Sequence, residues 1–361
     1  MTTDRAAFTW QGRPGRVVFG AGSLQHLERE LDALGLQRVL VLCGPQQRDG
    51  AAAIVARLGA RVAGLYDRAA MHVPIEVARE ARELAARLHA DGTLAIGGGS
   101  TVGLAKAIAL DSGLPILAVP TTYAGSEMTP IHGITEGGLK TTGRDERVLP
   151  RCVIYDPDLL ASLPAPLAVT SGLNAIAHAA EGLYAQDGNP VLDLMAEEGI
   201  RAIAAALPQL AKGTGSGQAG ARAGALYGAW LCGTVLGSAA MGLHHKLCHT
   251  LGGSFDLPHA QTHAVMLAHT LAYNASHAPH AMARIARALG APQAPQALFE
   301  LQRATSAPTA LRDIGMPEDG LDRVADLAVK TPYPNPRPLE RAALRALLQR
   351  AYEGAPPLSD A

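Results

Sequence analysis

The first 160 residues of the chain alternate short β-rich runs with helical patterns. Strand-like runs are RVVFG from Arg16, VLVLC over 39–43, RVAGLY from Arg61, TLAIGGGS from Thr93 and LPILAVPTT from Leu114. Helical patterns follow from Ser23, the expected N-cap, near 50–59 and over 75–90. Because a strand–helix–strand rhythm places parallel strands side by side under helices, this half predicts a Rossmann-like α/β domain.

The remainder of the chain has almost no strand signal. It predicts consecutive helices rich in Ala and Leu, over about 166–187, 190–211, 219–237, 240–252 and 260–275, with shorter ones to 353. We therefore expect two domains: residues 1–160 as the α/β dinucleotide-binding domain and residues 161–361 as an all-helical catalytic domain. The active site is expected in the cleft between them, where ligand sites often form.

Composition excludes several classes of partner. The formal net charge of the 361 residues is −1, so nothing steers the surface toward nucleic acid or an anionic membrane. No stretch approaches about 18 charge-free apolar residues, so no membrane span is expected. The N-terminus has no apolar signal core, and the four cysteines form no CxxC pair. These features predict a cytoplasmic protein with reduced, buried thiols.

A glycine-rich turn, IGGGST over 96–101, stands where a predicted strand leads into a helix. Glycines let the backbone approach a phosphate, and the helix start supplies free N–H groups. A second polar loop, PTTYAGSEMTP over 120–130, follows the next strand. The predicted cofactor-binding residues are Gly44, Gly97, Gly98, Gly99, Ser100, Thr101, Thr121, Thr122 and Ser126. No acid follows Gly44 to hold a ribose hydroxyl, so NADH and NADPH both remain open.

Six histidines fall between His244 and His269, and one more, His178, stands four residues after Asn174. His245 and His249 are also four apart, so each pair can share a helix face. His259 follows ten residues later, across a Gly-Gly turn and a proline. The spacing is typical of a metal site, but an amide stands at Asn174 where a carboxylate would be expected. We expect a shared active-site role for His245, His249 and His259, regard His244 and His269 as bystanders, and leave His263 undecided.

These residues resemble the iron-containing alcohol dehydrogenase superfamily, and within it the maleylacetate reductase branch. The likeness covers nearly the whole chain. It includes FGAGSLQHL, GGGSTVGLAKAIA, PTTYAGSEMTP, NAIAHAAE, HHKLCHTLGGSFDLPHAQTHAV and PYPNPRP. It implies an N-terminal dinucleotide-binding domain followed by a helical domain.

Two acids of the general family pattern are absent. Gly103 stands at the acid position of GGGSxxDxAK, and Asn174 stands at the metal-binding aspartate. The other family metal-ligand positions match His178, His245 and His259, and a further active-site histidine matches His249. Both losses are typical of the maleylacetate reductase branch, which is regarded as not needing a metal. The resemblance therefore implies NADH or NADPH as the cofactor and no metal.

The implied reaction is reduction of the carbon–carbon double bond of 2-maleylacetate to 3-oxoadipate, a step in degrading hydroxyquinol, resorcinol and chlorinated aromatics. Hydride addition makes an enolate, which histidines could stabilise and protonate. His245 and His249 are the first catalytic candidates, and His178 and His259 would support them. The dicarboxylate substrate needs cationic partners, for which Lys140, Lys246 and Arg337 are candidates. The likeness also implies a homodimer.

Three alternatives remain open. The chain could be a metal-dependent alcohol or glycerol dehydrogenase of the same superfamily, with Asn174 as a ligand. It could be a lyase resembling dehydroquinate synthase, although Asn174 argues against the metal that this enzyme needs. A binding protein without activity would leave the glycine turn, the threonine loop and the histidines without a purpose.

Overall fold

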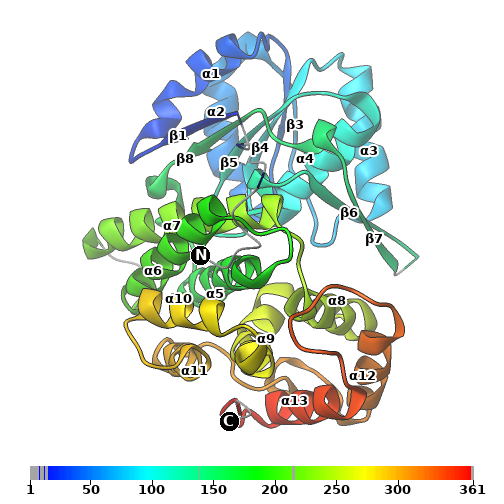
Figure 1. Cartoon of the computed structure of the whole chain (residues 1–361). Helices are drawn as coiled ribbons and strands as arrows, with labels where there is room; N and C mark the ends of the chain where they lie inside the picture. Colours follow the sequence, from blue (N-terminus) through cyan, green and yellow to red (C-terminus); the bar gives the residue numbers. More distant parts are fainter. Residues whose placement is uncertain (1–7, 9–11, 13–14, 138, 214–215, 359–361) are drawn as a thin grey trace. The chain divides into compact units, whose positions relative to one another are not determined.

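The computed structural model describes residues 8, 12, 15–137, 139–213 and 216–358 (Figure 1). The chain forms two compact units, one within Gln11–Ser162 and the other within Leu163–Ala361. The first unit is α/β and the second is helical, as the sequence pattern predicts.

The α/β unit is built on a six-stranded parallel sheet. Its strands are β1 (Arg16–Phe19), β2 (Val39–Leu42), β3 (Val62–Tyr66), β4 (Gly92–Gly97), β5 (Ile116–Pro120) and β8 (Cys152–Tyr155). They lie in the order β1-β8-β5-β4-β2-β3, and every pair is parallel. The central position of β4 places the glycine-rich turn between the ends of β5 and β2.

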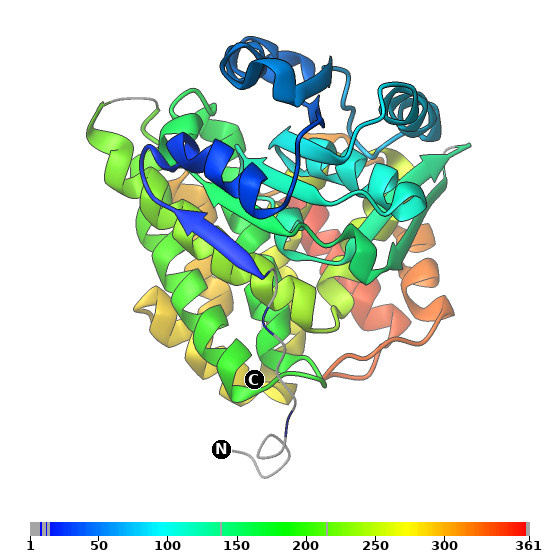
Figure 2. The same cartoon turned by 90° about the horizontal axis from the view of Figure 1, so that it is seen from above.

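Alternating side chains on the buried strands supply two hydrophobic cores, one on each face of the sheet. The strands and helices of this unit can be followed in Figure 2. Leu40 and Leu42 pack with α3 (Ile75–Arg87) and α4 (Gly99–Ser112). Val39 and Val41 pack with α1 (Leu27–Ala33) and α2 (Arg48–Leu58) on the opposite face. These strands are continuous apolar runs because helices cover both faces of the sheet.

Two local predictions differ from the structure. The first helix is preceded by a 3-10 turn (Ser23–His26) whose N-cap is Gly22, in the left-handed region at φ 71°. Ser23 does not cap it, because its hydroxyl donates to the Tyr155 carbonyl at 3.0 Å. An antiparallel hairpin of β6 (Ile131–Glu136) and β7 (Leu139–Arg144) was not predicted. The Gly137-Gly138 dipeptide, a common hairpin turn, was the available signal.

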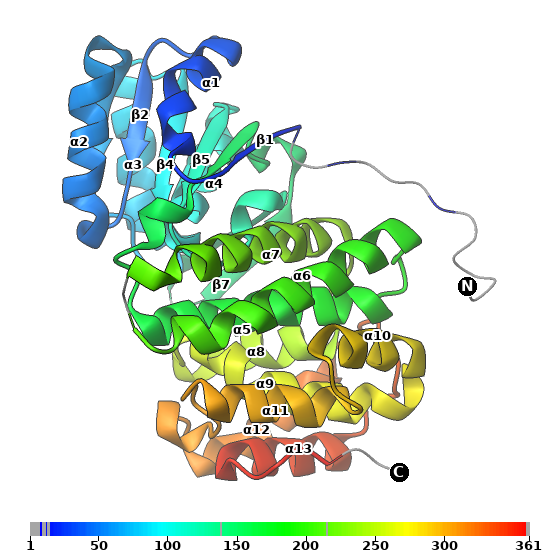
Figure 3. The same cartoon turned by 90° about the vertical axis from the view of Figure 1, so that its left-hand side faces the viewer.

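The helical unit contains α5 (Ala165–Tyr184), α6 (Pro190–Leu210), α7 (Ala219–Ser238), α8 (Leu243–Phe255) and α9 (His259–Asn274). Shorter helices follow: α10 (Pro279–Leu289), α11 (Ala294–Ala304), α12 (Leu321–Lys330) and α13 (Arg341–Glu353). The first five agree closely with the predicted ranges. Figure 3 shows α5, α6 and α7 lying side by side.

The four cysteines are buried and none forms a disulfide. Within the described residues, no single helix passes a length and hydropathy test for crossing a membrane. The pair α7 and α8 passes it only when joined, and the two helices are bent by 93°.

Glycines on α6 and α7 allow the two backbones to approach closely. A Cβ added at Gly228 would lie 2.8 Å from the Gly199 carbonyl oxygen and 3.2 Å from the Ile203 nitrogen. Both are backbone atoms, which cannot move aside as a flexible side chain can. A Cβ at Gly224, one turn earlier on the same helix, would meet nothing within 4 Å.

We therefore expect Gly228→Ala to destabilise the protein and Gly224→Ala to leave it unchanged or more stable. Overpacking of this kind costs about 1–3 kcal/mol, whereas alanine in an open helix position gains up to about 1 kcal/mol over glycine. Urea unfolding of both variants and the parent measures the difference. Equal stability of the two variants would contradict this account of the α6–α7 contact.

Candidate functional site

The glycine-rich turn forms a cradle at the end of β4. Gly97 ends the strand, Gly98 is the N-cap of α4, and no acidic residue stands in the first turn of that helix. A Cβ at Gly98 would lie 2.9 Å from the Thr122 side chain. The position therefore requires glycine, and the helix start offers its unpaired N–H groups and positive dipole end to an anion.

The second polar loop lies against the first. The Thr121 N–H donates to the Gly97 carbonyl at 3.1 Å, and the Thr121 hydroxyl is buried with no hydrogen-bond partner in the described part of the chain. Gly44 follows β2, the neighbour of β4 on the other side. The structure thus brings the predicted cofactor residues to one carboxyl-terminal edge of the sheet, where open α/β folds bind ligands.

Six histidine rings gather in the helical unit. They come from α5 (His178), α8 (His244, His245, His249) and α9 (His259, His263). Ring centroids lie 4.4 Å apart for His259 and His263, 5.0 Å for His245 and His263, and 5.2 Å for His178 and His245. The predicted residues His178, His245, His249 and His259 therefore meet. His244 and His263 join them, although His244 was expected to be a bystander.

His269 lies apart from this cluster. Its ring contacts Phe299 at 6.4 Å, and it borders a small cavity of about 150 Å³ that Arg337 and Arg350 also line. Its role as a bystander stays a prediction.

Glu181, which was not among the predicted site residues, is the acid of this centre. It is 1 % exposed and lies on α5, one turn after His178. His245 donates from Nδ1 to its Oε2 at 2.6 Å, and the Tyr184 hydroxyl donates to its Oε1 at 3.1 Å. The first-turn backbone N–H groups of α8 also donate to it, from Gly242 at 3.0 Å, His244 at 2.9 Å and His245 at 3.3 Å.

These contacts decide the charge of Glu181. Burial by itself raises the pKa of a carboxyl group, but the hydrogen bond and charge of His245, with smaller contributions from His244, lower the pKa of Glu181 to about 2. An ionised carboxylate thus stands on α5 two helical turns beyond the amide of Asn174. The available signal was the last letter of NAIAHAAE, three residues beyond His178 and on the same helix face.

Hydrogen bonds also fix the tautomers of two neighbouring rings. The Thr270 hydroxyl donates to backbone carbonyls of its own helix, at Met266 and Leu267, so it accepts from His244 Nδ1 at 3.0 Å. His244 Nε2 then carries a lone pair and accepts from His263 Nδ1 at 2.9 Å. This assignment leaves His263 Nε2 as an acceptor.

The rings of His178, His244 and His263 are neutral. Burial, and after it the nearby His245, lowers the pKa of His244 to about 3. Burial and the surrounding histidines hold the pKa values of His178 and His263 well below the ordinary range. Neutral imidazole is the form that ligates a metal ion.

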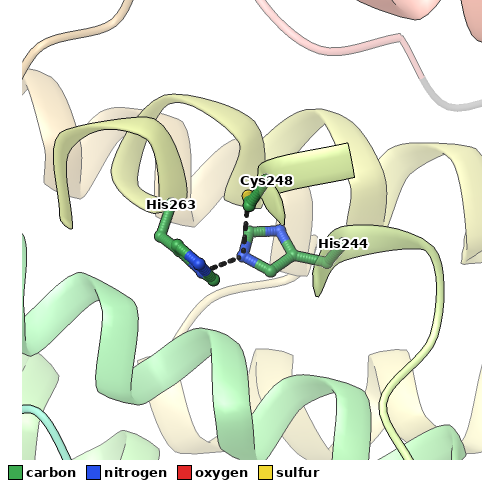
Figure 4. Close-up of side chains that lie close together, drawn as sticks. All are labelled: His244, Cys248 and His263. Carbon is green, nitrogen blue, oxygen red and sulfur yellow. Dashed lines mark hydrogen bonds between the residues drawn. The ribbon is translucent and has the colours of Figure 1, made fainter. Parts of the chain in front are cut away.

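The donor atoms fit a divalent metal ion. Buried atoms without a hydrogen-bond partner among the described residues include Asn174 Oδ1, His178 Nδ1, His245 Nε2 and His263 Nε2. In addition, His244, Cys248 and His263 each offer one ligand atom, and these atoms lie within 4.8 Å of one another (Figure 4). Nitrogen and sulfur ligands of this kind suit Zn²⁺ or Fe²⁺. Burial raises the pKa of Cys248 well above its usual range, so binding would have to displace the thiol proton.

The structure describes the side chains of two of the three predicted substrate cations, Arg337 and Lys246. The Arg337 guanidinium stacks on Tyr273 at 4.3 Å and donates to the Tyr273 carbonyl at 3.3 Å. Lys246, on α8, lies 5.8 Å from the Tyr333 ring. Lys140 belongs to β7 of the other unit, and its side chain lies outside the described part of the structure.

Comparison with known proteins identifies the family. The iron-containing alcohol dehydrogenase model matches residues 14–157, and the model for the C-terminal part of the Fe-containing alcohol dehydrogenase family matches residues 168–352. The chain therefore belongs to the iron-containing alcohol dehydrogenase family.

Several similar relatives are maleylacetate reductases. The chain is 62% identical over 351 residues to a maleylacetate reductase of Burkholderia cepacia, covering 97% of this chain and 99% of the relative. The crystal structure of maleylacetate reductase from Agrobacterium tumefaciens is 51% identical, with a TM-score of 0.93 and coverage of 97% and 99%. That from a Rhizobium strain is 51% identical, with a TM-score of 0.92 and coverage of 98% and 100%. The resemblance to this branch is confirmed.

The expectation that no metal is needed is wrong. Both family models name an iron-containing family, and the structure assembles a His–Cys–His group that can hold an ion. The expectation rested on the amide at Asn174, whereas His244, Cys248 and His263 together offer three further ligand atoms.

We expect Glu181→Gln to destabilise the protein by on the order of 3 kcal/mol, because the amide cannot accept all the N–H groups that the carboxylate accepts. The pKa of Glu181 is about 2 in the folded protein and about 4.5 by its ordinary value. The ionised carboxylate therefore contributes to the free energy of unfolding of the parent at higher pH, and this contribution is lost as pH falls from about 4.5 to 2. The variant has no such carboxylate and shows no such loss. Urea unfolding across this pH range measures both effects.

Glu198→Gln is the matched control. Glu198 is 36% exposed and pairs with Arg201 one turn away on α6, so its loss should cost less than about 1 kcal/mol. If the two variants were equally stable at neutral pH, the carboxylate of Glu181 would not organise the centre.

Proposed function

We propose that this protein reduces the carbon–carbon double bond of 2-maleylacetate to 3-oxoadipate, using NADH or NADPH. The observation that carries the proposal is 62% identity over nearly the full length to a maleylacetate reductase, together with the polyhistidine centre that the fold assembles. The product belongs to the breakdown of hydroxyquinol, resorcinol and chlorinated aromatics.

The chemistry explains why such a centre is useful. The double bond is conjugated to a ketone, so hydride addition at the remote carbon places negative charge on the ketone oxygen as an enolate. When bound, NADH or NADPH supplies that hydride. The chain must stabilise the oxygen and deliver a proton to the adjacent carbon.

His245 is the proposed stabiliser of the enolate oxygen. Its Nδ1 is committed to the buried Glu181 carboxylate at 2.6 Å, so Nε2 is the atom left for the substrate. The carboxylate fixes the ring orientation and stabilises positive charge on it, as the acid does in other His–carboxylate pairs. His249 lies one turn along α8, is exposed, and can exchange protons with water, so we assign it the proton for carbon. His178 and His259 support the two rings.

A divalent metal ion, when bound in this centre, would supply positive charge as a Lewis acid. His244, Cys248 and His263 are the residues that would hold it. The cofactor would be held by Gly44, the 97–101 turn, Thr121, Thr122 and Ser126. Lys140, Lys246 and Arg337 remain the proposed partners of the substrate carboxylates.

The proposal also covers how the chain is organised. Residues 1–160 bind the cofactor and residues 161–361 perform catalysis, and the active protein is a cytoplasmic homodimer. The family resemblance supports the dimer. Light scattering of the purified protein would measure its mass against the 37.4 kDa of one chain.

The deciding experiment is NADH oxidation with maleylacetate, followed by the absorbance of the reduced cofactor. Turnover with maleylacetate, at a kcat/KM far above that with simple alcohols and NAD⁺, is expected. The same assay after exhaustive chelation should show lost activity that Fe²⁺ or Zn²⁺ restores. Absence of NADH oxidation with maleylacetate in folded protein would reject the proposal.

We expect His245→Ala and His249→Ala each to lower kcat and kcat/KM on the order of 100-fold, because both groups act as the enolate forms. NADH affinity should stay within a few-fold, since neither residue belongs to the α/β unit. His280→Ala, at an exposed position on α10, is the control and should keep full activity. Near-normal turnover in both the His245 and the His249 variants would contradict this assignment, and His178 or His259 would then be the candidate proton donor.

A further inference from the structure

Lys106 is a fully buried cation of the α/β unit. It lies on α4, is 0% exposed, and stands seven residues after the helix begins at Gly99. At about 1.5 Å per residue, this places it roughly 10 Å along the helix from the glycine-rich turn. Burying an ammonium group is costly unless its N–H donors are all satisfied.

The partners of Lys106 all belong to one segment. Its Nζ donates to the carbonyl oxygens of Ser126 at 2.7 Å, Thr129 at 2.8 Å and Ile131 at 2.7 Å, and to the Thr129 hydroxyl at 2.9 Å. The Thr129 hydroxyl donates to the Ser126 carbonyl at 3.1 Å, so it accepts from the lysine. Three N–H groups thus hold four oxygens of one segment, which runs from Ser126 to the first residue of β6.

The same loop is fixed to the glycine-rich turn, between β4 and α4, at its other end. The Thr121 N–H donates to Gly97, and the Thr122 side chain packs on Gly98. The loop is therefore clamped along the first two turns of the helix, at the glycine turn by backbone and near Lys106 by an ammonium group. The proposed cofactor contacts Thr121, Thr122 and Ser126 lie between the two attachments or at them.

Nearby charge helps to keep the ammonium group inside. Burial lowers the pKa of Lys106 to about 7, while the charge of the buried Glu127 carboxyl opposes the shift. Glu127 is 1% exposed and accepts a hydrogen bond from Tyr155 at 2.8 Å. A plain apolar residue would fill the same space at lower cost, which indicates that the fixed loop geometry is what this lysine provides.

We propose that Lys106 is a positioning residue for the dinucleotide: it acts through the 121–131 loop to hold that loop's hydroxyl and N–H groups against the glycine cradle. This inference rests on the proposed cofactor site. On this account the affinity for NADH depends on Lys106 although the lysine does not contact the cofactor. A loop that is already ordered loses no conformational entropy when the cofactor binds, so binding is tighter.

The test compares Lys106→Met, which keeps the length and removes the donors, with Lys330→Met at an exposed position on α12. NADH dissociation constants are measured by fluorescence titration without substrate. We expect the Lys106 variant to weaken binding at least about tenfold. Its kcat at saturating NADH, and its KM for maleylacetate there, should stay within about threefold of the parent. Hydrogen exchange of the 121–131 amides should accelerate, while that of α1 and α2 should not.

An unchanged NADH dissociation constant in folded Lys106→Met would overturn the inference. If that variant does not fold, Thr129→Val decides, since it removes one of the four oxygens while the ammonium group of Lys106 keeps the other three. NADH binding that is about threefold weaker supports the inference, and an unchanged dissociation constant overturns it. NADH binding is measured without maleylacetate. If the parent protein binds NADH but does not turn over maleylacetate, the proposed function is rejected and the inference about Lys106 is still tested.

Discussion

The carboxylate of Glu181 is the interaction on which the helical unit's centre depends. It is buried on α5, yet it accepts the first free N–H groups of α8 and the Nδ1 proton of His245. A helix start normally needs such an acceptor, and here it comes from another helix. One ionised group therefore sets where α8 begins, how it sits against α5, and which ring nitrogen of His245 faces the other histidines.

This arrangement changes the meaning of the amide at Asn174. From the sequence, the missing acid at that position indicated a centre without negative charge. In the structure the negative charge belongs to Glu181, one helical turn beyond His178. There it orients the ring of His245 through a hydrogen bond. Outer groups of this kind tune the basicity and orientation of the rings that they hold. The inference from Asn174 to a metal-free protein failed because it counted one position and not the converging side chains of three helices.

The α/β unit uses a comparable device with opposite charge. Lys106 is a buried cation whose N–H groups hold backbone oxygens of the loop beside the glycine turn. In each unit a buried charge satisfies backbone groups that regular secondary structure leaves unpaired. Such groups are costly to bury alone, so each charge also specifies one conformation of the segment that it holds.

The sequence alone determined the two architectures, the helix ranges from 166 to 275, the glycine cradle and the four histidines of the predicted centre. These follow from periodicity and from local spacing, which act along the chain and can be read from it. Only the tertiary structure decided that His244 and His263 join the centre, that Glu181 supplies its charge, and that Lys106 holds the loop beside the glycine-rich turn. Those contacts join residues 19 to 64 positions apart, and their partners are chosen by how helices and loops pack, which spacing along one element cannot specify.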